Sequence, residues 1–458
     1  MILLETARRA LSVNQRALDT VGHNMANAST PGYSRQEVIL TASEPTKAGV
    51  GLLVGTGVKL ADIRRHFDAF LDAQLRAHSS QLAFNLSMQD ALQQVEIFLG
   101  EPSEAGVMSS LERFWVALND LAQHPESMAT RALVRESAGT AATIISRAAL
   151  DLRALRQDIE ETLRARVAEV NGLAKEIAEF NYQITSSRAR GHSTNDLEDK
   201  RDLLVDRLAE LTGARATVGP QGDVRVSLSG IALVDSHASH PISLARDTGG
   251  DLRVAREGME AFLQLGGAMG GLLRADQDLA GRTLRALDTL AAGIVDGFNR
   301  VHAAGYGLDG STGTAFFVMA GGAATLRLSD VVMDGETGLR AIAAASTPVT
   351  GDSENARRLA GLKENLPVGG FTGWDEYWRN VVAGVGVTGA EVNRSAMVGR
   401  LLVKEIENRR DSVRGVSLDE EVTNLVRFQH AYAAAARLAT AADELLDVII
   451  NRLGLVGR

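Results

Sequence analysis

The sequence of 458 residues contains no cysteine. This absence excludes disulfide bonds, thiolate metal sites and cysteine nucleophiles, and it suits a chain that must stay uncrosslinked during export. Aromatic residues make up only 4% of the chain, and there are only eight prolines. Ala, Leu and Val therefore supply most of the apolar content, which favours narrow helix–helix seams over a thick globular core.

Two further absences narrow the range of partners. No window reaches the apolar length that a membrane-spanning helix needs, and the apolar start Ile2-Leu3-Leu4 is too short for a signal peptide. Acidic and basic residues are interleaved and the net charge is −9, so there is no basic patch of the kind that a phosphate backbone demands. We therefore expect neither nucleic acid nor a membrane as a partner. If the protein leaves the cell, we expect it to do so without a cleaved signal.

Both ends of the chain carry apolar stripes whose members are spaced alternately by three and four residues. The N-terminal stripe, interrupted only by Asn14, consists of Leu4, Ala7, Leu11, Asn14, Leu18, Val21 and Met25. The C-terminal stripe consists of Leu425, Phe428, Tyr432, Ala435, Ala439, Ala442, Leu446, Ile449 and Leu453. Such a stripe is a coiled-coil face that needs a partner helix, and a buried Asn in it usually fixes the register, which is how we interpret Asn14. The two stripes predict a stalk closed by the chain ends rather than an enzyme.

Between the ends, the periodicity changes from helical to alternating at Thr212-Gly213. Residues 126–188 lack proline and are rich in Ala, Leu, Arg and Glu, which predicts one very long helix, or two with a break near Gly139. After Gly213, apolar residues alternate with polar ones between turn signals, which predicts a small antiparallel β domain. Residues 305–371 are rich in Gly, Thr and Asp and are expected to be irregular or partly β.

We therefore predict a mainly α protein with inserted β structure. A discontinuous helical coiled-coil stalk is formed by the N- and C-terminal segments, and it carries a small antiparallel β domain and an irregular outer insertion. The expected units are an N-terminal axial helix and extended segment (1–66), a long helical stalk (67–213), the β domain (214–268), a return helix (269–304), the irregular, partly β insertion (305–371) and the C-terminal stalk and axial helices (372–458).

Two local patterns resemble sites of chemistry. Asp235, His237 and His240 could ligate a divalent metal, but they fall in a turn between strands with no further ligand nearby, so solvated loop histidines are the favoured interpretation. The glycine-rich segment 266–271 precedes a helix as a phosphate loop would, yet it lacks the Gly-Lys-Ser/Thr ending and the dinucleotide spacing. We interpret it as a strand-to-helix hinge.

Trp374, Tyr377 and Trp378 cluster in a chain that otherwise has few aromatic residues. They could form a platform for a ligand, but the start of a helix that packs on the stalk is the better interpretation. No Ser/His/Asp set with motif context occurs. We accordingly predict no catalytic residue, no metal ligand and no cofactor.

The terminal strings resemble those of a known family. Residues 10–27, followed by Ser29-Thr30-Pro31-Gly32-Tyr33-Ser34-Arg35-Gln36, closely resemble the N-terminal signature of bacterial flagellar rod, hook and hook-associated proteins. The ending at 32–36 is most similar to the hook-associated protein 1 family, since rod and hook proteins usually have Gly-Phe-Lys there. Residues 415–421 and 425–432 resemble the same family's C-terminal signature. Its internal landmarks are matched by Asn195-Asp196-Leu197, by residues 200–204, and by Phe298-Asn299 with His302 and Gly305.

One departure from this family is visible. Its members often carry a large second insertion after the segment that here spans 305–317, whereas this chain reaches Trp374 soon afterwards. An outer domain is therefore expected to be reduced or missing.

The resemblance implies a non-catalytic axial protein that forms a ring between the flagellar hook and the filament. It implies export by the flagellar type III apparatus, an extracellular location in the flagellum, self-association, contacts with the hook protein and hook-associated protein 3, and an export chaperone at the C-terminal helix. Assembly would bury the terminal apolar stripes, so the terminal helices of a free subunit would be frayed. The residues expected at the assembly interface are Leu4, Leu11, Asn14, Leu18, Val21, Asn24, Asn27, Pro31, Gly32, Tyr33, Leu425, Phe428, Tyr432, Leu446 and Ile449.

Three alternatives remain at this level. Another flagellar axial protein (hook, rod or flagellin-like) would share the terminal apolar stripes. It is not expected to carry both the motif at 33–36 and the motif Phe428-Gln429. A metal-dependent enzyme would need Asp235, His237 and His240 to bind metal. A membrane-scaffold coiled coil would need basic amphipathic faces.

Overall fold

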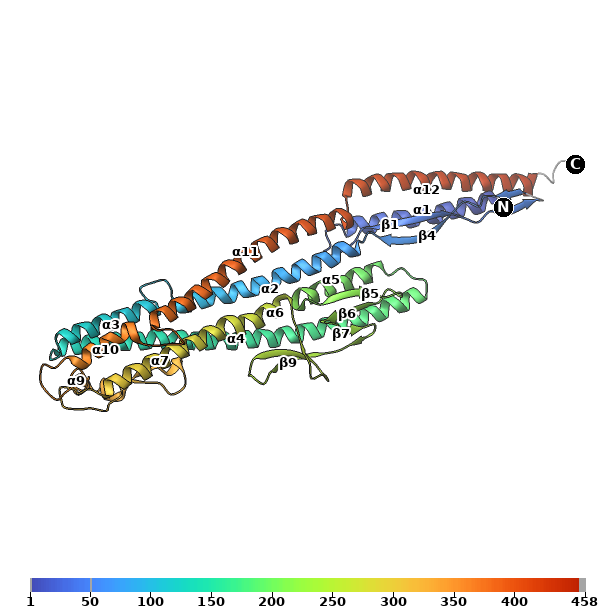
Figure 1. Cartoon of the computed structure of the whole chain (residues 1–458). Helices are drawn as coiled ribbons and strands as arrows, with labels where there is room; N and C mark the ends of the chain where they lie inside the picture. Colours follow the sequence, from blue (N-terminus) through green and yellow to red (C-terminus); the bar gives the residue numbers. More distant parts are fainter. Residues whose placement is uncertain (1, 50–51, 453–458) are drawn as a thin grey trace.

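The computed structural model describes residues 2–49 and 52–452 and shows an elongated molecule with both chain ends at the same tip (Figure 1). At this tip α1 (Ile2–Ala26) lies beside α12 (Leu418–Asp447), which continues into the π-helical turn η3 (Val448–Arg452). The opposite tip contains α3 (Val107–Gln123) and α10 (Glu354–Asn365). The chain thus runs from one tip to the other and returns.

Long helices build the body between the two tips. α4 (Met128–Ala189) is a single helix of 62 residues, with no break at Gly139 and with the Ser127 side chain capping its start. At about 1.5 Å per residue it is roughly 90 Å long. The other body helices are α2 (Ala69–Leu99), α5 (Asn195–Thr212), α6 (Gly267–Arg274), the π-helix η1 (Ala275–Gly281), α7 (Arg282–Ala303) and α11 (Trp374–Arg414). α11 runs along α2, and α6 packs against both α2 and α5.

The few aromatic residues are concentrated in the core towards the far tip. Phe114, Trp115 and Phe298 are fully buried and lie with ring centroids 5.3 to 6.5 Å apart. Trp374 stacks on Trp115 at 6.3 Å and, like Trp378, is fully buried at the start of α11. The predicted role of this cluster as a helix start that packs on the body is confirmed.

The predicted change of period at Thr212-Gly213 is also confirmed, because α5 ends at Thr212 and Gly213 follows in the left-handed conformation. The antiparallel strands after it are β5 (Arg215–Val218), β6 (Val224–Leu228), β7 (Ile231–Asp235) and β8 (Ala238–Ser239), then β9 (Ile242–Arg246), β10 (Leu252–Arg256) and β11 (Phe262–Leu263) in a second sheet. The buried Asn181 of α4 bonds both the N–H and the C=O of Val224, which fixes the first sheet on the helix.

Segment 305–371 differs in part from the expectation. It has two-residue strands, β12 (Phe317–Val318) and β13 (Arg327–Leu328), a 3₁₀ turn η2 (Ala323–Thr325), and the short helices α8 (Asp330–Met333) and α9 (Gly335–Arg340). It also contains α10, whose Ala356 and Leu359 are fully buried. α10 packs on α3 and α7, so this part of the segment belongs to the body core.

Candidate assembly interface

The N- and C-terminal helices pair with each other in the chain. Asn24 of α1 donates a hydrogen bond from Nδ2 to Glu421 Oε2 of α12 at 3.2 Å, and the helices run antiparallel (Figure 1). Ala7, Val21, Ala435 and Ala442 from the two predicted stripes are buried. Each end of the chain therefore covers part of the apolar stripe of the other.

The remaining predicted interface residues divide by exposure. Val21 and Asn24 are buried, whereas Leu11, Asn14, Leu18, Asn27, Gly32, Tyr33, Leu425, Phe428 and Leu446 are half-buried. Leu4, Pro31, Tyr432 and Ile449 are exposed, and Leu453 lies outside the described residues. Asn14 donates to the carbonyl of Ala10 in its own helix, so its bond does not cross to α12. Its role in fixing the register stays a prediction.

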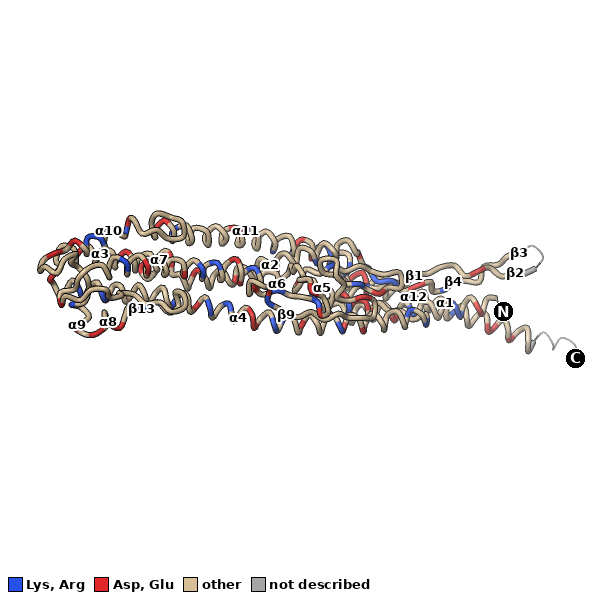
Figure 2. The backbone as a smooth tube through the Cα atoms, turned by 60° about the horizontal axis from the view of Figure 1, so that its bottom comes forward, with Lys and Arg blue, Asp and Glu red and all other residues tan. Residues whose placement is uncertain are grey.

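A long β-hairpin runs along α1 towards the terminal tip (Figure 2). Its base pairs β1 (Gln36–Ala42) with β4 (Val58–Arg65), and its outer part pairs β2 (Thr46–Gly49) with β3 (Leu52–Val54). Gly32 enters this hairpin with φ of +78°, and a Cβ there would lie within 2.6 Å of Leu203 atoms. Only glycine fits this close approach of the backbone to α5.

Asn24 organises the turn between α1 and the hairpin. Its side chain bonds both the N–H and the C=O of Gln36 at 2.9 Å, and it accepts a hydrogen bond from the Tyr33 hydroxyl at 2.7 Å. Burial, together with nearby carboxylates, raises the pKa of Tyr33, so its hydroxyl keeps its proton. Asn24, Gly32 and Tyr33 of the predicted interface are therefore brought together, and they shape the chain locally.

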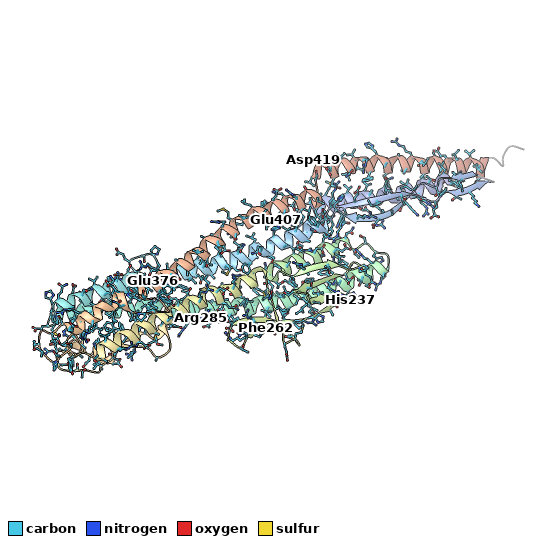
Figure 3. All side chains as sticks on the ribbon, viewed as in Figure 1. His237, Phe262, Arg285, Glu376, Glu407 and Asp419 are labelled. Atoms are coloured by element: carbon cyan, nitrogen blue, oxygen red, sulfur yellow. The ribbon has the colours of Figure 1, made fainter. Side chains whose placement is uncertain are left out.

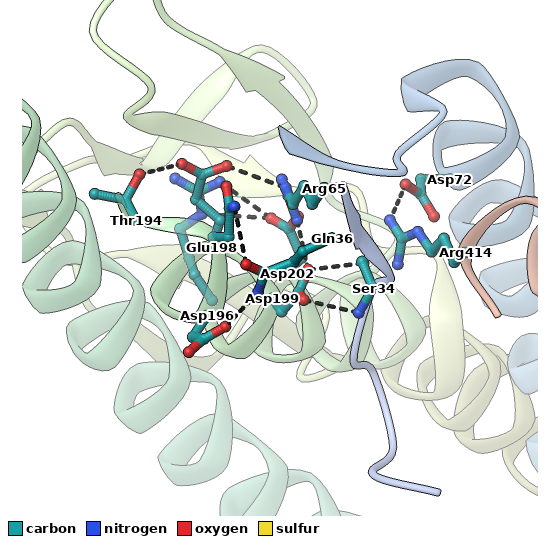
Figure 4. Close-up of polar contacts among 12 residues, drawn as sticks. Ser34, Gln36, Arg65, Asp72, Thr194, Asp196, Glu198, Asp199, Asp202 and Arg414 are labelled. Atoms are coloured by element: carbon teal, nitrogen blue, oxygen red, sulfur yellow. Dashed lines mark hydrogen bonds and ion pairs between the residues drawn. The ribbon is translucent and has the colours of Figure 1, made fainter. Parts of the chain in front are cut away.

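A cluster of charges joins the hairpin to α5 (Figure 4). The guanidinium of Arg65 lies 2.8 Å from both Asp199 and Asp202 and 3.1 Å from Glu198, and its side chain is only 9% exposed. Asp199 also accepts hydrogen bonds from the N–H and Oγ of Ser34 at 2.8 Å. Burial raises the pKa of Asp199, whereas Arg65 and Arg201 outweigh burial at Asp202 and hold its pKa below the usual value. We call Arg65, Glu198, Asp199, Arg201 and Asp202 the joint cluster.

Three further ion pairs lie where the start of the hairpin, α12 and the body meet. Arg35 contacts Glu421 at 2.7 Å and Glu420 at 2.8 Å, and its N–H donates to the carbonyl of Arg414 at the end of α11. Arg414 in turn pairs with the buried Asp72 of α2 (Figure 4). Burial raises the pKa of Asp72 although Arg414 lies against it. Arg35 and Arg65 thus fix the terminal segments on the body, and Arg414 joins the end of α11 to α2.

Sequence reasoning missed these joint residues. The signal available was the acidic string at the start of α5, which matched a family landmark without revealing its partner. Arg65 lies 134 residues before Asp199, so no local periodicity links the two.

Large apolar side chains remain exposed on the outer faces of α11 and of α12 with η3. They are Val387, Met397, Val398, Leu401 and Leu402 on the first, and Leu418, Val422, Val426, Tyr432, Leu445, Val448, Ile449 and Ile450 on the second. Soluble monomers rarely expose contiguous apolar surface of this kind, which marks interaction sites. No helix among the described residues is long and apolar enough to span a membrane.

The groups that resembled sites of chemistry are engaged elsewhere. Asp235 pairs with Arg225 at 2.8 Å, and His240 accepts a hydrogen bond from Arg256 at 2.9 Å. His237, labelled in Figure 3, is exposed and lies 3.0 Å from Thr185 Oγ1. In residues 2–49 and 52–452 no group of three or more His, Cys, Asp or Glu side chains could hold a metal. The glycine-rich segment 266–271 forms the start of α6 after β11, with Gly266 at the N-cap, and Gly267, with φ of +58°, packs against the backbone of α5.

Comparison with known proteins gives concordant matches. The family of the flagellar hook-associated protein FlgK helical domain matches residues 92–317, that of the flagellar basal body rod FlgEFG protein C-terminal matches 412–453, and that of the flagella basal body rod protein matches 4–33. Flagellar hook-associated protein 1 of Bacillus subtilis is 31% identical over 99% of both chains. The same protein of Salmonella typhimurium is 26% identical over 98% of this chain and 99% of its own.

A solved structure has the same fold. The flagellar hook junction protein FlgK from Burkholderia pseudomallei superimposes with a TM-score of 0.66 at 16% identity, over 74% of this chain and 100% of that chain. The mainly α fold with inserted β structure predicted from the sequence is therefore confirmed. With full-length similarity to the Bacillus protein above 30% identity, the chain belongs to the flagellar hook-associated protein 1 family, whose members are structural proteins of the flagellum.

Proposed function

We propose that this protein is an axial structural component of the flagellum that forms a ring between hook and filament, and that copies associate through the outer faces of α1 and α12. The proposal is supported by the pairing of the terminal helices. Their inner faces cover each other, whereas the outer face of α12 leaves large apolar side chains exposed to solvent. Burying such side chains against a neighbour removes apolar area from water and drives association.

The proposal extends to the other partners. In the ring, one rim would contact the hook protein and the other hook-associated protein 3, as the family resemblance implies. Export by the flagellar type III apparatus would require a partner that covers the apolar face of α12 before assembly, which is the role of an export chaperone. The joint cluster would set the direction in which the terminal helices leave the body, because charge pairs with fixed geometry orient two segments.

The experiment replaces two exposed valines of α12, in the variant Val422→Asp with Val426→Asp. Both side chains are 46% exposed, so the fold of the free subunit should change little in circular dichroism. In the assembled ring, two carboxylates would be desolvated at a cost of several kcal/mol. Cells that carry the variant should release flagellin into the medium instead of building filaments.

The matched control is Val218→Asp with Val349→Asp, which makes the same change at exposed positions of β5 and of the loop before α10. It should leave filaments and motility intact. Normal filaments in the α12 variant, with the protein exported at its usual level, would contradict assembly through this face.

A further inference from the structure

A groove lies between α1 and the β1–β4 hairpin, on the side of α1 away from α12. Its volume is about 630 Å³, and Ser12, Val13 and Arg16 of α1 line it together with Ser43 and Lys59 of the hairpin. Residues 8, 12 and 16 are spaced by four and therefore share a helix face, opposite the face that carries Ala7, Leu11 and Leu18. The chain's own α12 packs on that second face, so it does not reach the groove.

The groove carries a net positive charge, because four cations, Arg8, Arg9, Arg16 and Lys59, line it together with one carboxylate, Glu44. Arg8 and Arg9 are paired with Glu5 at 2.9 Å, but Arg16 and Lys59 form no ion pair within residues 2–49 and 52–452. Ser43 is buried, and its Oγ has no hydrogen-bond partner in the same ranges. A buried hydroxyl without a partner costs free energy, so an occupant that offers an acceptor would be stabilised here.

The register of the terminal helices leaves the end of α12 without a partner. Asn24 contacts Glu421, and 22 residues separate Asn24 from Ile2, so the same number of steps along the antiparallel α12 reaches Asp443. Beyond Asp443 the helix extends past the start of α1, as Figures 1 and 2 show. We call residues 443–450 the overhang.

The overhang combines apolar and acidic side chains. Leu445, Val448 and Ile450 are exposed, Leu445 by 57% and Ile450 by 71%. Asp443 and Glu444 are exposed, and neither forms an ion pair among the described residues. At about 100° per residue, Glu444, Leu445 and Val448 fall within an arc of about 100° on the helix surface, so one face presents a carboxylate beside two apolar groups.

We propose that the overhang of one copy docks in the groove of a second copy of this chain. Charge complementarity supports this occupant, because Asp443 and Glu444 would meet the unpaired Arg16 and Lys59, while Leu445 and Val448 would cover Val13 and the apolar rim. The contact cannot close within one chain, since the overhang extends past the start of α1 and the groove lies on the opposite face. It is head-to-tail, so it links copies in series. The inference rests on assembly through the terminal helices and adds which surfaces meet.

The test is a charge exchange across the contact. Arg16→Glu with Lys59→Glu, and separately Asp443→Lys with Glu444→Lys, should each reduce filament number about tenfold or more, because like charges face each other at the contact. Combining all four substitutions restores opposite charges and should recover filaments. A combined variant no better than the two separate ones would overturn the proposal, provided circular dichroism shows all three folded.

The absence of cysteine permits a direct second measurement. Ser12→Cys with Leu445→Cys should give disulfide-linked multimers in isolated flagella under mild oxidation, whereas each single variant should not. Ser12→Cys with Val349→Cys, whose second position lies in the far part of the body, is the matched control. Filaments without the cross-link would exclude this docking but leave the proposed function standing. The Val422→Asp, Val426→Asp variant tests that function separately.

Discussion

Removal of Arg65 should release the β-hairpin from the body. Arg65→Met keeps most of the length of the side chain but deletes the cation that lies 2.8 Å from Asp199 and Asp202 and 3.1 Å from Glu198. The side chains of these carboxylates are 6 to 8% exposed, so water cannot replace the lost partner fully. Two cations would remain beside these carboxylates: Arg201 pairs with Asp202 at 3.1 Å, and Arg188 pairs with Glu198 at 2.6 Å. Asp199 would lose its cation.

The distances and the burial of these charges set the size of the expected loss in docking free energy. At an effective dielectric constant near 20, two charges about 4 Å apart attract each other by about 4 kcal/mol. Arg65 has several such partners, but the cost of taking its own charge out of water offsets much of their sum. Deleting one partner of a buried pair typically costs about 3–5 kcal/mol, because the other charge stays behind. We expect the docking of the hairpin on α5 to weaken by this amount.

Hydrogen exchange of residues 36–65, measured in the full-length protein, checks the expectation. The free energy of the opening that exposes the amides of β1 and β4 should be about 3–5 kcal/mol lower than in the unchanged protein. The amides of α4 should keep their protection from exchange. Arg64→Met is the matched control, since Arg64 is 70% exposed and, in the part of the chain that the structure describes, pairs only with Asp62, so its removal should cost less than about 1 kcal/mol.

A second variant tests the electrostatic cause. Adding Asp199→Asn to Arg65→Met removes the carboxylate that has lost its cation and should recover part of the lost protection, while Asp202 keeps Arg201. If Arg65→Met changes hairpin exchange no more than Arg64→Met does, the joint cluster does not hold the hairpin, and the reasoning is refuted.

Two further predictions concern stability at acid pH and export. His302 is fully buried between the carbonyl of Thr314 and the N–H of Ala343, and burial lowers its pKa to about 4. The contribution of neutral His302 to the free energy of unfolding is therefore full above pH 6.5 and is lost as the pH falls towards 4. At pH 5 this contribution should be about 2 kcal/mol smaller than at pH 7.5. Urea unfolding followed by tryptophan fluorescence should show this loss relative to His302→Gln. Its absence would mean that the imidazole takes up a proton in the folded protein as readily as in the unfolded chain. Leu446→Asp with Ile449→Asp should abolish capture of the purified subunit by its export chaperone; unchanged chaperone affinity would remove this part of α12 as the binding segment.

Elements with a strong local pattern could be predicted from the sequence. The proline-free stretch predicted the helical course of α4 but left open a break near Gly139, and the switch to alternating residues at Gly213 predicted the β structure, because both signals repeat over many residues. α10 was not predicted, since its 12 residues lie in a segment rich in Gly and Asp that masks a short helical period. Its burial depends on α3 and α7, which lie far from it in the sequence.

The candidate interface was predictable only in part. The terminal stripes showed that α1 and α12 need partners, but a stripe does not say whether its partner is the same chain or a neighbour. The pairing of Asn24 with Glu421 spans 397 residues and sets the register that leaves the overhang uncovered. The joint cluster could not be predicted from the sequence either. The partners of Arg65 come from a distant part of the chain, and no periodic pattern links them to it.

The two kinds of contact at the terminal end have complementary physical roles. Charge pairs such as Arg65 with Asp199 and Arg414 with Asp72 have definite geometry, so they fix direction, but the cost of desolvation leaves them little net strength. Exposed apolar groups such as Leu445 supply strength without direction, since burial of apolar area is not directional. A subunit that must add at one orientation and then stay needs both. In the proposed assembly, the joint cluster would orient the terminal helices before the apolar faces meet, and an assembly built on either contact alone would be loose or misaligned.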